Sequence, residues 1–391
     1  MRILYLFILS IINHSICQAQ WQQTGINGEA IYCFAVSGSN IFAGTHDNGV
    51  FLSTNNGSNW TVVNNGLTDT SIWSIAINGA NIFAGTHSGV FLSTNNGSSW
   101  TAVNSGLTNT TIWSLTVNGT NIFAGTHNGV FLSTNNGGIW TAVNNGLPLY
   151  SDVRSLAVSD TNILAGTYDA GVFLSSNNDS SWTAINNGLT YTANDNWSFA
   201  TSGTNIFAGS VGNVFLSTNN GSNWTAVNNG LADTNIVWSF AVSGANIFVG
   251  TYGGGVFLSS NNGSNWTAVN NGLTDIRVQS LAICGTNIFA GTAGNGVWKR
   301  PLSEITAVEN ISHNNVFSIC PNPLTSSSIL QFNVEVKNAA IVIYDVLGKE
   351  MTRKQFTGKR IEIEKENLAS GVYFVSVLDN ERQHVQKIVV K

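Results

Sequence analysis

The chain is 391 residues long, enough for two or three ordinary domains or for one large repetitive domain and a small one. Only 9% of its residues are charged, 10% are aromatic and 40 are glycine. This composition excludes a disordered chain, which needs high charge and few aromatic residues, and it indicates many short strands joined by tight turns. The net charge is −5 and no cluster of Lys and Arg forms a basic stripe, so we expect no nucleic-acid partner.

The N-terminus consists of one arginine, a largely apolar run over residues 3–12 and a short small or polar sequence. This pattern predicts a secretory signal peptide over residues 1–19, cleaved after Ala19. Cys17 would permit a lipoprotein, but Ile16 stands where a lipoprotein signal needs a small residue. No segment reaches the roughly 18 apolar residues of a membrane span, so we expect no transmembrane segment.

A Gly-Thr dipeptide, Gly-Ser in one copy, recurs every 40 to 43 residues. Its glycines are Gly44, Gly85, Gly125, Gly166, Gly209, Gly250 and Gly291. A period near 40 without a helical pattern is typical of β-propeller blades of four strands each. In the second repeat, β-branched and aromatic runs bounded by Asn-Gly turns predict strands over residues 72–77, 81–86, 89–93 and 100–103.

The last repeat indicates how the ring closes. It ends at residues 296–301 without a fourth strand, whereas residues 21–24 align with the fourth strand of the first repeat at residues 60–63. We therefore expect residues 21–24 to complete the seventh blade. The predicted fold class is all-β: a seven-bladed β-propeller over residues 20–302, followed by a small C-terminal β-sandwich domain.

An eight-residue box, Ser-Thr-Asn-Asn-Gly-Ser-Asn-Trp at residues 53–60, lies between the third and fourth strands. Five more copies end at Trp100, Trp140, Trp182, Trp224 and Trp266. The box resembles the Asp-box of sialidases, xyloglucanases, sortilin-type receptors and photosystem-assembly-factor propellers, with Asn in place of Asp in every copy and Asp179 in place of Gly in the fourth. The resemblance implies the propeller fold and no particular activity.

Residues 303–315 read as a linker, and residues 316–391 carry four motifs in order. They are a Pro-Asn-Pro element, a Tyr-Asp-x-x-Gly-Lys turn, a Ser-Gly-Val-Tyr-Phe-Val strand and a basic terminus. This series resembles the sorting domain of type IX secretion cargo, although Cys320 stands where an aromatic residue is common; the alternative is a generic β-sandwich module. The resemblance implies recognition by the type IX machinery, export, removal of the tail, and release or anchoring at the cell surface. Its sorting-signal residues are Pro321, Asn322, Pro323, Tyr344, Asp345, Gly348, Lys349, Gly371, Tyr373, Lys387 and Lys391.

In propellers of this kind, the loops from the fourth strand to the next first strand and from the second to the third strand share one face, the usual ligand face. At the second position of the first strand, the seven blades carry Tyr32, Trp73, Trp113, Arg154, Trp197, Trp238 and Gln279. After the repeated dipeptide, five blades carry His46, His87, His127, Tyr168 and Tyr252. Flat aromatic faces with a few polar groups suit sugar rings or protein loops, so we predict a ligand-binding site here. The alternative is that these rings only pack between blades.

Catalytic and metal sites are harder to find. Equivalent histidines in neighbouring blades would lie roughly 10 Å apart, too far for one zinc ion, so we expect neither a metal nor a cofactor. A sialidase is excluded because the propeller has three arginines and a single Glu, Glu29. A xyloglucanase-type hydrolase would need two carboxylates about 6.5–9.5 Å apart. The loop acids are Asp47, Asp69, Asp152, Asp169, Asp195, Asp233 and Asp275.

The sequence therefore predicts a secreted or cell-surface, monomeric binding or adhesion module without catalytic activity, whose ligand is a glycan or a protein. The alternative is a polysaccharide hydrolase of the xyloglucanase type.

Overall fold

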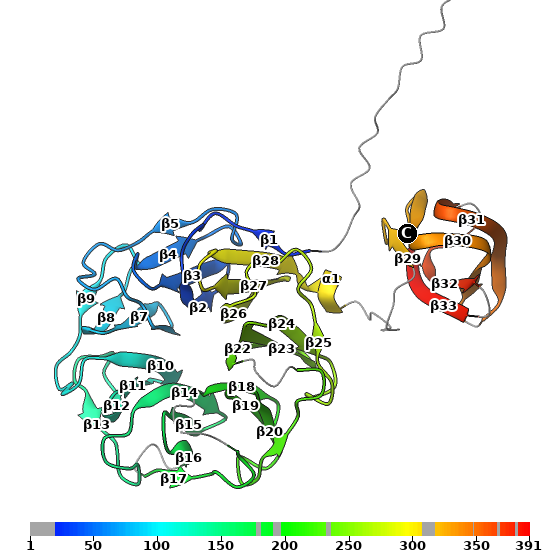
Figure 1. The fold of residues 1–391 in the computed structure, drawn as a ribbon. Helices are drawn as coiled ribbons and strands as arrows, with labels where there is room; N and C mark the ends of the chain where they lie inside the picture. Colours follow the sequence, from blue (N-terminus) through cyan, green and yellow to red (C-terminus); the bar gives the residue numbers. More distant parts are fainter. Residues whose placement is uncertain are drawn as a thin grey trace, which may run out of the picture. The chain divides into compact units, whose positions relative to one another are not determined.

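The structure is a computed structural model and describes residues 20–176, 181–190, 197–231, 236–306, 317–346, 348–365, 368–379 and 382–391. It divides into a compact unit over Gln20–Thr306 and a second unit that contains the described residues from Phe317 to Lys391. The first unit holds seven four-stranded sheets arranged in a ring, with the first strand of each sheet toward the middle (Figure 1). The predicted seven-bladed propeller and the all-β fold class are confirmed.

Within each of the first four sheets, the strands are arranged in chain order from the inside of the ring outward. Their strands are β2 (Ile31–Ser37), β3 (Asn40–Thr45), β4 (Val50–Ser53) and β5 (Thr61–Val62); β6 (Ser74–Asn78), β7 (Asn81–Thr86), β8 (Gly89–Ser93) and β9 (Thr101–Ala102); β10 (Ile112–Asn118), β11 (Asn121–Thr126), β12 (Gly129–Ser133) and β13 (Thr141–Ala142); and β14 (Val153–Ser159), β15 (Asn162–Thr167), β16 (Gly171–Ser175) and β17 (Thr183–Ala184).

The remaining three sheets include the one that joins the two ends of the ring. Their strands are β18 (Ser198–Ser202), β19 (Asn205–Gly209), β20 (Val214–Ser217) and β21 (Thr225–Ala226); β22 (Ile236–Ser243), β23 (Asn246–Tyr252), β24 (Gly255–Ser259) and β25 (Thr267–Ala268); and β26 (Val278–Cys284), β27 (Asn287–Thr292), β28 (Val297–Pro301) and β1 (Gln22–Gln23).

The glycine of the repeated dipeptide lets neighbouring sheets approach closely. A Cβ atom on Gly85 would lie 2.7 Å from Cγ2 of Ile112, the first residue of the next sheet. A Cβ atom on Gly44 would likewise lie 2.7 Å from Cγ2 of Ile72. At these two positions, glycine is needed because a branched side chain leading into the next sheet occupies the space that a methyl group would fill.

The box between the third and fourth strands fastens each sheet to the one before it. In the second sheet, Asn95 Oδ1 accepts hydrogen bonds from Ser93 Oγ at 2.9 Å and from the amide of Ser99 at 2.9 Å. Trp100, 4% exposed, donates from Nε1 to the carbonyl of Val63 in the first sheet at 2.7 Å. The amide oxygen of Asn thus accepts the turn hydrogen bonds that a carboxylate would accept, and the indole crosses to the neighbouring sheet.

The N-terminal segment supplies the fourth strand of the seventh sheet. Strand β1 pairs with β28, with Gln22 opposite Lys299 and Gln23 opposite Trp298. Trp21, 2% exposed, takes the place of a box tryptophan and donates from Nε1 to the carbonyl of Val269 at 2.7 Å. The buried Arg300 donates to the same carbonyl at 3.0 Å, so both ends of the propeller chain meet at one backbone oxygen of the sixth sheet.

The propeller continues past the predicted boundary at residue 302. A short helix, α1 (Leu302–Thr306), follows β28, and its Ile305 is buried against the core of the last two sheets. The expected linker over residues 303–315 is therefore wrong at its first four residues, because Ile305 removes apolar surface from water by packing on the propeller. The remainder of that segment, 307–315, lies outside the described residues.

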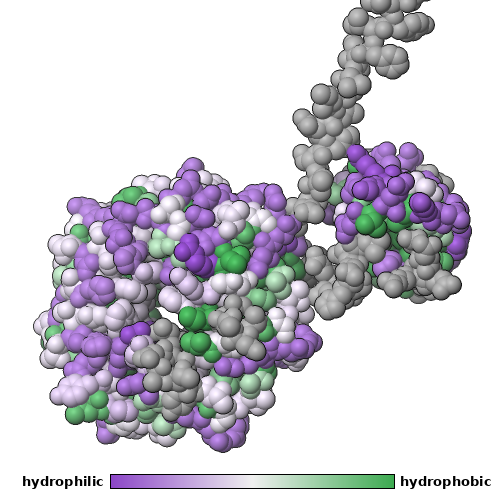
Figure 2. Space-filling view, in the orientation of Figure 1, coloured by the Kyte–Doolittle hydropathy of each residue, from purple (hydrophilic) through white to green (hydrophobic). Residues whose placement is uncertain are grey.

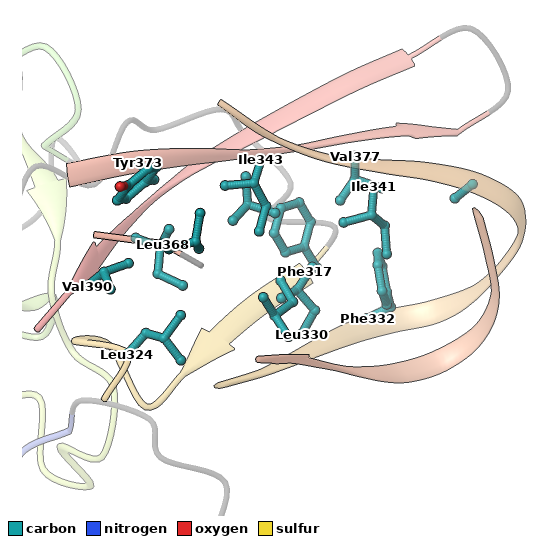
Figure 3. Packing of buried hydrophobic residues seen from close by; sticks show 14 of the residues in the cluster. Phe317, Leu324, Leu330, Phe332, Ile341, Ile343, Leu368, Tyr373, Val377 and Val390 are labelled. Carbon is teal, nitrogen blue, oxygen red and sulfur yellow. The ribbon is translucent and has the colours of Figure 1, made fainter. Parts of the chain in front are cut away.

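The second unit is a five-stranded sheet that folds over its own core. Its strands are β29 (Phe317–Cys320), β30 (Ser327–Asp345), β31 (Glu350–Glu364), β32 (Gly371–Asp379) and β33 (Arg382–Val390), in the order β29-β30-β32-β33, with β31 paired to β30. The two halves of the long β30 lie on opposite sides of the core: Leu330 and Phe332 face Ile341 and Ile343 across it (Figure 3). Register shifts in the middle of β30 accompany the bend.

Candidate functional site

A β-bulge sets the orientation of the side chains that the sequence predicts at the ligand face. In the first sheet, Ile31 pairs with Thr45 and Cys33 pairs with Gly44, so Tyr32 is an extra residue between them. The same register shift occurs at Trp113, Arg154, Trp238 and Gln279. A bulge turns its extra residue away from the regular alternation of the strand, and this places these side chains in a separate layer from the core.

Side chains from the first four sheets form a continuous series of contacts, which we call the aromatic arc: Tyr32, Trp73, Trp113, Arg154 and Tyr168. The ring centroids of Tyr32 and Trp73 are 4.6 Å apart, and those of Trp73 and Trp113 are 5.0 Å apart. The guanidinium carbon of Arg154 lies 5.3 Å from the Trp113 ring and 3.8 Å from the Tyr168 ring. All five residues are partly exposed.

The histidines follow the arc but do not converge on one point. His46 lies edge-on to Tyr32 at 5.2 Å, and His87 lies between Trp73 and Trp113 at 5.1 and 5.6 Å. His127 is further along, with Nδ1 3.3 Å from Asp152 Oδ2. Within the residues described, no three His, Cys, Asp or Glu side chains gather to hold a metal ion.

The sixth and seventh sheets continue the site with fewer rings. Trp238 stacks on Tyr252 at 5.7 Å, whereas Gln279 is buried at 8% exposure. Burial, followed by the charges of Asp47 and Tyr252, raises the pKa of Tyr32 above its usual value.

Trp197 does not belong to this layer, which corrects the prediction that its side chain lies at the ligand face. The Cβ atom of Trp197 lies 2.5 Å from where a Cβ atom on Gly166 would stand. Ile72 occupies the equivalent place beside Gly44, and Ile112 occupies it beside Gly85. Trp197 is 4% exposed and packs in the core of the fifth sheet. Trp197 therefore occupies the place of the buried aliphatic residue of the other sheets, although Ser198 pairs with Gly209 just as Ser74 pairs with Gly85.

Two arginine–carboxylate pairs belong to the same loops. Arg154 contacts Asp152 Oδ2 from Nε at 3.1 Å and from Nη2 at 3.0 Å. Arg277 binds both oxygens of Asp275, at 2.9 and 3.0 Å. Sequence analysis did not single out Arg277; its spacing of two residues from Asp275, the same as that of Arg154 from Asp152, was the available signal.

Asp69, another of the loop acids that we considered for catalysis, also has local partners. Asp69 accepts the amides of Ser71 at 3.0 Å and of Ser88 at 2.9 Å. Burial opposes its charge, but these hydrogen bonds outweigh burial and lower the pKa of Asp69. Asp195 and Asp233 lie outside the described residues.

In the second unit, the Pro-Asn-Pro element holds the C-terminal strand. Asn322 donates from Nδ2 to the carbonyl of Lys387 at 3.0 Å and accepts the amide of Val389 at 2.8 Å. Both Pro321 and Pro323 follow cis peptide bonds. The first and last sequence motifs of this unit are therefore in direct contact, although about 65 residues separate them along the chain.

The other two motifs form a turn and a core contact. Asp345 Oδ1 accepts the amide of Lys349 at 2.9 Å, and Gly348 has the positive φ of 82° that this turn requires. Tyr373, 7% exposed, donates its hydroxyl to the carbonyl of Ala369 at 3.0 Å. Lys349, Lys387 and Lys391 are exposed, as are Gly371 and the two prolines, whereas Tyr344 is partly buried.

Residues 318–391 match the family model of the secretion system C-terminal sorting domain. This match confirms the resemblance drawn from the four motifs. The second unit is a sorting domain of type IX secretion, and its presence indicates export to the cell surface or outside. No helix among the residues described is long and apolar enough to cross a membrane.

The chain is also similar to solved propellers. PorZ, an essential surface component of the type IX secretion system of Porphyromonas gingivalis, superposes with a TM-score of 0.60 at 16% identity, covering 94% of this chain and 60% of PorZ. The GH74 xyloglucanase of Xanthomonas campestris gives 0.59 at 13% identity, with 95% and 68% covered. YCF48 from Cyanidioschyzon merolae gives 0.57 at 13% identity, with 75% and 100% covered. These likenesses show the fold alone, and no curated protein matches the sequence.

Proposed function

We propose that this exported propeller is a binding or adhesion protein without catalytic activity, and that its ligand, a glycan or a protein, binds at the aromatic arc. The observation that carries the proposal is the unbroken series of contacts from Tyr32 to Tyr168, in which the Arg154 guanidinium joins the rings of Trp113 and Tyr168; the series is built from four different sheets and is partly exposed. Aromatic side chains supply large contact area at a small cost in conformational entropy, which is why they recur at binding surfaces.

The burial of the arc supports a surface role. A residue that serves only to fill the space between sheets becomes buried, as Trp140 does at 2% exposure. Trp73 and Trp113 keep part of their surface in water although they contact each other. Their recurrence in successive repeats together with this partial exposure supports ligand contact as their role.

A polysaccharide hydrolase of the xyloglucanase type is the alternative. Asp152 is the acid that favours it, because this carboxylate is only 7% exposed and its Oδ1 has no hydrogen-bond partner among the described residues. Such a hydrolase would need a second carboxylate about 6.5–9.5 Å away, and Asp152 itself is paired with Arg154 through Oδ2. Asp69 and Asp275 are each engaged by neighbouring groups, which argues against either as that partner.

The test is a glycan and protein array probed with the chain from Gln20 onward, followed by titration of any ligand against variants. Trp73→Ala should lower affinity by about 1–3 kcal/mol, as the loss of an interface aromatic does. Ile139→Ala, at an exposed residue in a box, is the matched control and should bind as the unsubstituted chain does. A fall in melting temperature for Trp73→Ala with no ligand on the array would remove the proposal. Xyloglucan cleavage that Asp152→Asn abolishes would establish the alternative.

A further inference from the structure

The loops of the ligand face carry an excess of negative charge. Six acidic side chains lie on described residues of these loops: Glu29, Asp47, Asp69, Asp152, Asp169 and Asp275. Only two basic side chains, Arg154 and Arg277, accompany them, which leaves a net charge of −4, and each is paired with an aspartate. The other two basic residues of the propeller, Lys299 and Arg300, lie on β28. A partner that approaches this face is therefore favoured if it is cationic.

The same loops carry most of the exposed apolar side chains of the propeller. Seven large hydrophobic residues of its described part are exposed, and five are on these loops: Leu149, Tyr150, Val211, Tyr252 and Ile276. The surface seen in Figure 2 is otherwise mostly hydrophilic or neutral, with small separate hydrophobic patches. Exposed aliphatic groups such as Leu149 and Ile276 do not stack on sugar rings, but they do pack against apolar side chains of a protein.

Tyr150 is the most unusual residue of this set. It is 73% exposed and has a φ of 61°, a left-handed conformation that bulky side chains rarely adopt. Its loop is held by Ser151, which donates from its amide and its hydroxyl to the carbonyl of Pro148 at 3.3 and 2.7 Å. A strained, exposed aromatic residue on a fixed loop is a pattern found at ligand-contacting positions.

We propose that the ligand of this face is a polypeptide segment in which Lys or Arg alternates with apolar residues. This inference rests on the proposed binding function and names its ligand class. Cationic side chains would lie over the ring faces of Tyr32 and Trp73, where the ring quadrupole attracts them. Apolar side chains of the segment would pack on Leu149 and Tyr150, and the carboxylates would steer the approach.

The hydrogen-bonding groups of the face favour a polypeptide over a glycan. A sugar is held by free carboxylates, amides and guanidinium groups that reach its hydroxyls. The carboxylates of Asp69 and Asp275 and the guanidinium of Arg154 are already bonded within the protein. The net negative charge of the loops still acts over several ångströms, so it favours a cationic partner without direct contact.

The experiment titrates three probes into the chain that begins at Gln20 and measures their binding by calorimetry. Two probes are the synthetic hexapeptides (Lys-Leu)3 and (Glu-Leu)3, and the third is a xyloglucan heptasaccharide. We expect (Lys-Leu)3 to bind at least tenfold more tightly than (Glu-Leu)3 at 50 mM salt, and to weaken severalfold at 0.5 M salt. Tyr150→Gly should weaken (Lys-Leu)3 binding at least fivefold without lowering the melting temperature, because glycine adopts a φ of 61° without strain. Ile139→Gly, at 59% exposure in a box, should leave binding unchanged.

Equal binding of the two peptides, or binding that is indifferent to Tyr150→Gly, would overturn this inference. Heptasaccharide binding that Trp73→Ala abolishes would overturn it too, but would leave the proposed binding function in place. Absence of any ligand, both among these three probes and on the array, would remove the inference and the proposed function together.

Discussion

Tryptophan recurs at two places in the propeller repeat, once at the end of the box and once in the bulge of the first strand. Trp140 represents the first set: it is 2% exposed and donates from Nε1 to the carbonyl of Val103 in the preceding sheet at 2.7 Å. Trp113 represents the second: it is partly exposed, and its Nε1 is buried without a hydrogen-bond partner among the described residues. Identical side chains that recur at one period therefore have different surroundings, which hydrogen bonding and burial reveal and recurrence does not.

We expect the stability of the closed ring to depend on the tryptophans of the box positions. Trp21, which takes the place of a box tryptophan in the seventh sheet, offers the strongest test. Deletion of residues 20–25 removes strand β1 and the buried Trp21 together with its hydrogen bond to Val269. Loss of a buried tryptophan alone costs about 3–5 kcal/mol, and the open edge of β28 adds to this. We expect a large fall in the free energy of unfolding, measured by urea or thermal denaturation.

Gln22→Ala is the control for that deletion, because Gln22 is exposed on the same strand. It should unfold as the unsubstituted chain does. An unchanged melting temperature for the deletion would show that β1 is not needed for closure, and that Trp21 is not equivalent to the box tryptophans.

Trp140→Phe tests the hydrogen bond rather than the burial. Phenylalanine keeps most of the apolar contact but cannot donate to the carbonyl of Val103, which then loses a partner inside the protein. An unsatisfied buried polar group costs about 1–3 kcal/mol, so the free energy of unfolding should fall by that amount. The free energy of unfolding is to be measured in urea for the variant and the parent, with the same m-value for both. A variant as stable as the parent would mean that the indole contributes only its packing.

Much of this architecture could be predicted because it rests on period and turn chemistry. The spacing of Gly44 and its equivalents indicated the sheets, and the alignment of residues 21–24 with the fourth strand indicated where the ring closes. The alignment could not show where the side chain of Trp197 packs, because its Trp-Ser pair stands in the same register as Trp73 and Ser74. Only the packing of Trp197 beside Gly166 and its 4% exposure show that it stands at the buried position.

The site was predictable as a set of positions but not as a set of contacts. Repeat alignment gave the position of Arg154 in its sheet, whereas its place between the rings of Trp113 and Tyr168 depends on how two sheets and two loops meet. The exposure of Tyr150 depends on a turn with a positive φ, which a Leu-Tyr sequence does not indicate. Loop geometry of this kind is fixed by tertiary packing, which local sequence patterns do not encode.

Trp113→Phe is the matched partner of Trp140→Phe and should have the smallest effect. The indole Nε1 of Trp113 has no partner among the described residues, so its removal breaks no hydrogen bond there and ends the burial of an unsatisfied donor. Phenylalanine can still contact Trp73 on one side and Arg154 on the other, so the free energy of unfolding should change by less than about 1 kcal/mol. The two variants are to be unfolded in urea side by side. A loss as large as that of Trp140→Phe would make the bulge tryptophans structural like the box tryptophans, and the recurrence of rings in the arc would then need no ligand to explain it.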